Sequence, residues 1–92
     1  NNLVGGQLQH QLEGNEDVER TLGEIQTLNA NLIESGEEKR KRGGANNWVV
    51  MDAVGTKGKG KFIVETPLRP DPQKVFETIE LRLEDGTVIK IR

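Results

Sequence analysis

The segment with the clearest chemical signature is Gly-Thr-Lys-Gly-Lys-Gly-Lys, residues 55–61. Gly55, Gly60 and Lys61 match the spacing of a phosphate-binding P-loop, in which glycine amides and a lysine hold nucleotide phosphates. The next residue should be Ser or Thr to hold magnesium, but it is Phe62. The stretch that should form a helix is rich in β-branched residues and ends at a proline. The pattern therefore favours a solvated hairpin loop, and we expect no nucleotide or other cofactor.

Two clusters of basic residues have the composition of a phosphate-contact surface. One is the run Lys39, Arg40, Lys41 and Arg42, and the other is Lys57, Lys59 and Lys61 of the loop. Such clusters can contact nucleic-acid backbone or an acidic partner without reading bases. Cations also suit the end of a helix, because they complement the negative pole of its dipole. The net charge of −2 is unlike the basic footprint of most nucleic-acid-binding domains, so we favour the second interpretation and keep nucleic-acid contact as the alternative.

The sequence contains no spacing typical of a catalytic or metal site. His10 is the single histidine and cysteine is absent, so zinc ligation of the usual kinds is not encoded. The carboxylates are scattered, and Glu65 and Glu77 are the pair that a sheet could bring closest together. Paired-carboxylate chemistry also needs a concave, partly desolvated site, for which a small sheet has little room. We therefore expect a protein that is not an enzyme and holds no metal.

Composition describes a polar-surfaced protein, with 33% hydrophobic and 30% charged residues. It has no apolar run near the roughly 20 residues of a membrane span and no signal-peptide pattern at its start. We expect an intracellular location, with nucleus and cytoplasm both open. A chain of 92 residues without disulfides or zinc usually gains stability by oligomerisation.

The first half has the periodicity of a helix. Asn15 is a good N-cap, acidic residues follow it, and Ser35-Gly36 is a plausible stop, which predicts a helix over 16–35. A weaker helix is expected over 3–13. An alternating three-four spacing predicts a coiled-coil seam and oligomer interface made of Val18, Leu22, Ile25, Asn29 and Leu32.

The second half has the alternation and turn residues of strands, predicted over 48–54, 61–66, 78–84 and 87–92. Asp71-Pro72 could begin a helical turn before the third strand. In the last hairpin, a turn with Gly86 in the bulge position sets Leu81 opposite Ile89 and Glu80 opposite Lys90. This register is favoured because a one-residue slip would mix polar and apolar residues on both faces.

These features together predict an α+β protein, with a coiled-coil-like N-terminal helix followed by a small antiparallel four-strand β domain. The expected domains are residues 1–42, helical and ending in the basic run, and residues 43–92. We expect a non-enzymatic oligomerisation or protein-interaction module that forms a homo-oligomer, with a dimer favoured, or a hetero-oligomer. The alternative is a nucleic-acid-associated module in which both basic clusters form one strip. No membrane or small-molecule partner is expected.

Overall fold

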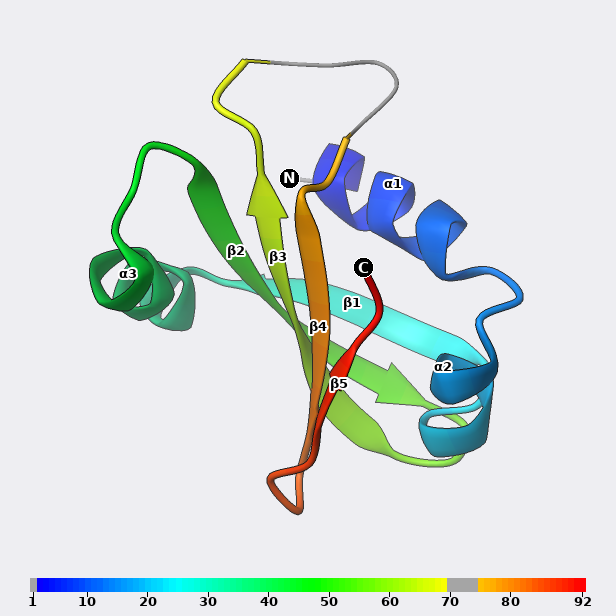
Figure 1. Ribbon diagram of the computed structural model, residues 1–92. Helices are drawn as coiled ribbons and strands as arrows, with labels where there is room; N and C mark the ends of the chain where they lie inside the picture. The colour runs from blue at the N-terminus through cyan, green and yellow to red at the C-terminus, as the bar shows by residue number, and fades with distance from the viewer. Residues whose placement is uncertain (1, 70–74) are drawn as a thin grey trace.

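The protein is built on one antiparallel sheet, whose five strands follow one another in chain order (Figure 1). The computed structural model describes residues 2–69 and 75–92. Its elements are α1 (Asn2–Leu12), α2 (Glu16–Thr21), β1 (Ile25–Asn31), α3 (Leu32–Arg42), β2 (Asn47–Gly55), β3 (Lys59–Thr66), β4 (Thr78–Leu83) and β5 (Val88–Lys90). Within this part of the chain, none of the helices has the length and apolarity that crossing a membrane requires.

The helix predicted over 16–35 is wrong, and so is the fold class of a four-strand domain after a coiled-coil-like helix. That range forms α2, then β1, and then the start of α3. The backbone N–H groups of Leu22 and Gly23 both donate to the carbonyl oxygen of Val18, at 2.8 and 3.1 Å, which closes α2. Gly23 has a φ of 72°, a left-handed conformation that ends helices and suits glycine. The apolar three-four spacing therefore spans a helix, a turn and a strand.

The strand that was not predicted from the sequence is β1, which pairs antiparallel with β2. Leu28 lies opposite Ala53, and Ala30 lies opposite Met51. The register shifts between Ile25 and Thr27, so the regular part of the strand is Thr27–Asn31. This long-range pairing is the physical reason for the error, because local periodicity does not reveal which distant strand a segment will find.

Other local predictions had mixed outcomes. The helix expected over 3–13 is confirmed as α1, and Asn15 caps α2 by accepting a hydrogen bond from the N–H of Val18 at 3.1 Å. Ser35-Gly36, which was expected to end a helix, lies inside α3. The helical turn proposed at Asp71-Pro72 lies outside the described residues. The predicted boundary after residue 42 falls at the end of α3, on the connection into β2.

The four predicted strands of the second half are confirmed as β2 to β5, and so is the register of the last hairpin. Leu81 lies opposite Ile89, and Glu80 lies opposite Lys90. The N–H of Leu83 donates to the carbonyl oxygen of Thr87 at 2.8 Å, as the bulged turn requires. Glu80 is half-buried beneath α3, where it forms an ion pair with Arg42.

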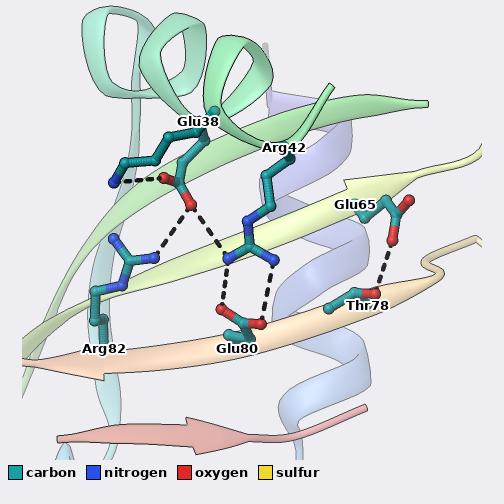
Figure 2. A network of polar contacts seen from close by, with 7 residues as sticks. Glu38, Arg42, Glu65, Thr78, Glu80 and Arg82 are labelled. Atoms are coloured by element: carbon teal, nitrogen blue, oxygen red, sulfur yellow. Dashed lines mark hydrogen bonds and ion pairs between the residues drawn. The ribbon is translucent and has the colours of Figure 1, made fainter. Parts of the chain in front are cut away.

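The two faces of the sheet are covered by different helices of the same chain. On one face, α1 and α2 pack on the sheet to form the main core, which comprises Leu8, Leu12, Val18, Leu22, Met51, Ala53, Phe62, Val64, Phe76, Ile79 and Leu81. Val50 and Ile63 alternate with these strand residues and so point to the other face, which α3 crosses (Figure 2). The second face is therefore covered from within the protomer, and not by a dimer built around a long helix.

Candidate interaction surface

The groups that could do chemistry are dispersed over the molecule. His10 lies on the exposed side of α1, with Nδ1 3.9 Å from a carboxylate oxygen of Glu13. The Glu65 carboxylate accepts hydrogen bonds from the hydroxyl of Thr78 at 2.8 Å and the amide of Asn46 at 3.0 Å. Among the described residues, no three His, Cys, Asp or Glu side chains gather closely enough to hold a metal ion.

The basic run Lys39–Arg42 forms the last turn of α3, and three of its four cations contact oxygen atoms of the chain itself. Lys39 Nζ donates to the carbonyl oxygens of Gly44 and Asn46, at 3.0 and 2.6 Å, and so joins the helix end to the next loop. Lys41 and Arg42 both approach the carboxylate of Glu38. Only Arg40 lacks an acceptor within the described chain, so most of the positive charge of this run is used in holding the fold.

The glycine-lysine segment is the turn between β2 and β3, as the hairpin interpretation predicts. The N–H of Gly55 donates to the carbonyl oxygen of Gly58, and the N–H of Lys57 donates to that of Leu22, both at 2.8 Å. A Cβ on Gly55 would lie 2.1 Å from the Leu22 oxygen, so only glycine fits without a shift. The loop is thus fastened against the end of α2, which gives its glycines a structural role.

The lysines of this segment point to different surroundings. Lys61 belongs to β3 and forms an ion pair with Glu34 of α3, with Asp52 3.6 Å away. The hydrogen bond to Glu34 is the main reason that the pKa of Lys61 is raised, followed by the opposing effect of desolvation. Lys57 and Lys59 are exposed and have no acidic partner within the described residues.

The basic run Lys39–Arg42 and the loop lysines Lys57 and Lys59 lie toward opposite ends of β2 (Figure 1). The Lys39–Arg42 run precedes the first residue of β2, and the loop follows its last residue, Gly55. A strand rises about 3.3 Å per residue, which puts roughly 25 Å between the two ends of a nine-residue strand. Lys57 and Lys59 are therefore far from the basic run along the strand, whereas Lys61 lies opposite Asp52 and contacts Glu34 of the helix that carries the run.

Glu38 is the buried charged residue of the described chain, 4% exposed, between α3 and the sheet (Figure 2). Its Oε1 accepts hydrogen bonds from Arg82 of β4 at 3.1 Å and from Arg42 at 3.2 Å. Arg42 also donates to both carboxylate oxygens of Glu80, and its guanidinium lies 4.3 Å from the centroid of the Trp48 ring. These contacts clamp the last turn of α3 onto β2 and β4.

The charges around Glu38 determine its protonation. Desolvation by burial raises its pKa, but the charge and hydrogen bond of Arg82, with the charges of Arg42 and Lys41, outweigh that effect. The pKa of Glu38 therefore lies below the ordinary value of a glutamate. The pKa of Arg42 is raised, chiefly by its hydrogen bonds to Glu80. Glu38 and Arg42 are therefore both charged at neutral pH.

The five residues of the predicted seam do not share one surface. Val18 and Leu22 are buried in the core, Ile25 and Asn29 belong to β1, and Leu32 begins α3. Leu32 is 81% exposed and its neighbour Ile33 is 78% exposed. The surface members of the seam thus follow the outer strand of the sheet and the helix start that adjoins it.

The two edges of the sheet differ in a way that bears on binding. β5 has only three residues and ends in Lys90, whereas β1 has seven residues, Ile-Gln-Thr-Leu-Asn-Ala-Asn, without a charge or a proline. Gln26, Thr27, Asn29 and Ala30 of β1 are exposed. Natural sheet edges are commonly protected from pairing by short length, charge, proline or bulges. Such protection is present at β5, and at β1 it is limited to the irregularity near Ile25.

Reasoning from sequence missed β1 and the burial of Glu38. One signal in the sequence argued against a single helix over 16–35. Asn31 and Glu34 have the spacing of a capping pair, which indicates that a new helix begins after Asn31 and that the residues before it belong to another element. In the structure, the N–H of Glu34 donates to Oδ1 of Asn31 at 3.0 Å, and Nδ2 of Asn31 donates back to the Glu34 carboxylate at 2.7 Å. The burial of Glu38 had no local signal, since it depends on Arg82, which lies 44 residues away in the chain.

Comparison with protein-family models, with curated proteins and with solved structures finds no match to this chain. Its function therefore has to be inferred from its own residues and geometry.

Proposed function

We propose that the protein is a non-enzymatic protein-interaction module that binds an extended strand along the edge of β1. The observation that carries this proposal is the uncharged, proline-free and exposed character of β1 in a chain of which 30% of the residues are charged. Main-chain hydrogen bonds to an added strand supply affinity in this mode of recognition, and alternate side chains supply specificity.

The surroundings of β1 support the same role. Leu32 and Ile33, both largely exposed, directly follow the strand and offer apolar contact area at its end. On the α1 side, a groove of about 540 Å³ is lined by residues of α1 and by Leu28, Ala30, Leu32 and Met51. Side chains of an added strand would have room there without displacing the core.

A nucleic-acid-associated module is less well supported by this geometry. Four of the seven basic residues proposed for it, Lys39, Lys41, Arg42 and Lys61, contact oxygen atoms within the protein or lie near them. Arg40, Lys57 and Lys59 are the basic side chains left for such a role, and a few separated cations bind phosphate weakly.

The proposed function is tested by titrating the isotopically labelled chain with a peptide that copies residues 24–33. We expect saturable NMR shifts confined to the amides of residues 25–33. The matched control is the same peptide carrying Leu28→Pro and Ala30→Pro, which cannot complete a ladder of backbone hydrogen bonds. With the chain kept monomeric by dilution, equal shifts with both peptides, or none with either, would refute strand binding at β1.

A further inference from the structure

The strand that β1 accepts can be identified from the composition of β1 itself. Its regular part is Thr27–Asn31, and the charged residues nearest to it in the chain are Glu24 and Glu34. A strand without charge cannot repel an identical strand, and an antiparallel pair of identical strands is compatible with the two-fold symmetry of a homodimer. We propose, on the basis of the proposed function, that the partner is a second copy of this chain, paired antiparallel through β1.

One register uses the whole regular part of the strand. With the two-fold axis at Asn29, the Asn29 residues of the two copies lie opposite each other, Leu28 lies opposite Ala30, and Thr27 lies opposite Asn31. Leu28 and Ala30 share the face of Ala53 and Met51, while Thr27, Asn29 and Asn31 share the other face. Apolar residues thus meet apolar residues and polar residues meet polar ones, which is the condition for a stabilising cross-strand pair.

The same register covers the exposed apolar residues at the strand end. Leu32 and Ile33 follow the last residue of β1, and antiparallel pairing brings the first residues of the other β1 beside them, including half-buried Ile25. Because the interface is symmetric, this contact forms twice. A single strand from an unrelated partner would cover Leu32 and Ile33 of one chain only.

α3 leaves space for the second copy beside β1. It packs mainly on β2 and much less on β1, so it is set back from the edge, while α1 contacts β1 on the other face of the sheet. With the two-fold axis perpendicular to the sheet, both α3 helices lie on one face and both α1 helices lie on the other. The result is one continuous sheet made of two copies of the five-stranded unit.

The experiment measures the mass of the full chain by light scattering over a hundredfold concentration range. We expect the mass to approach twice the 10.2 kDa of one chain. Asn29→Lys sets two like charges against each other at the axis and should raise the dimer dissociation constant by about tenfold or more. Within one protomer this lysine faces Asp52, its partner on β2, so the fold should tolerate it. Val88→Lys adds the same charge on exposed β5 and should leave the dimer unchanged.

A dimer that is equally insensitive to Asn29→Lys and to Val88→Lys would overturn the proposal. A chain that stays monomeric over the whole range, yet binds the peptide of residues 24–33, would overturn the homodimer and leave the proposed function standing. A monomer that does not bind the peptide would refute both.

Discussion

Removal of the Glu38 carboxylate tests how α3 is held on the sheet. Glu38 is 4% exposed and accepts hydrogen bonds from Arg82 and Arg42. A hydrogen bond to a charged group contributes about 1.5–3 kcal/mol. The side chains of Arg82 and Arg42 are 35% and 29% exposed, so water replaces part of what they lose, and Arg42 keeps Glu80. We therefore expect Glu38→Ala to lower the free energy of unfolding by about 2–3 kcal/mol, near one such bond and not the sum of two.

The assay is urea unfolding followed by the fluorescence of Trp48, whose ring is stacked with Arg42 and reports the release of the helix end. The matched control is Glu37→Ala, the preceding residue of the same helix turn, which is exposed. Helix propensity and net charge change equally in both variants. We expect the control to change the free energy of unfolding by less than about 0.5 kcal/mol. Equal effects from both variants would refute the role given to Glu38.

The Glu38 carboxylate also makes the stability of the protein depend on pH. Because the pKa of Glu38 is lower in the folded protein than its ordinary value, protons bind more strongly to the unfolded chain. The stabilisation is complete above the ordinary glutamate pKa of about 4.3 and is lost as the pH falls through the lower folded value. The difference in unfolding free energy between the natural chain and Glu38→Gln should therefore shrink below about pH 4. A difference that grows in acid would contradict the assigned shift.

Three further predictions follow from the structure. Leu81→Ala, at a fully buried position, should lower the free energy of unfolding by about 2–5 kcal/mol. Val88→Ala on exposed β5 should lower it by less than about 1 kcal/mol. Equal losses from the two variants would contradict the hairpin register. Gly55→Ala should destabilise the protein by about 1–3 kcal/mol, because its Cβ would meet Leu22. Gly6→Ala, in an open position on α1, should stabilise it by up to about 1 kcal/mol. Thermal melts in which both variants shift the melting temperature in the same direction would be inconsistent with the packing. Retention on heparin should be weak and already lost at about 0.15 M salt, and retention that requires much higher salt would revive the nucleic-acid alternative.

Much of the β half was predictable because its signals are local. Alternation, turn residues and the face argument for Leu81 and Ile89 define β2 to β5, and these strands pair with neighbours in the chain. The capping role of Asn15 was predictable for the same reason, since its hydrogen-bond partner is three residues away.

The errors fall where distant contacts decide the structure. Val18, Leu22 and Ile25 keep coiled-coil phase, yet Leu22 is buried against the sheet and Ile25 begins a strand that pairs with β2. The basic run was expected to follow a helix that ends at Ser35-Gly36, whereas it forms the last turn of α3, and its contacts with Glu38 and Glu80 could not be derived from spacing. Identifying the free edge required knowledge of the strand order, because β1 becomes an edge only through its position beside β2.

The central claim, that β1 is the interface between two copies, is tested most directly by a disulfide at the proposed axis. The chain has no cysteine, so Asn29→Cys introduces a single thiol. Residues directly opposite each other in an antiparallel pair have Cβ atoms about 4.5–5.5 Å apart, close enough for a disulfide after a small adjustment. Under mild oxidation we expect Asn29→Cys to form a covalent dimer rapidly and nearly completely, with Val88→Cys reacting slowly as the exposed control. Equal and slow cross-linking of the two variants would contradict the account.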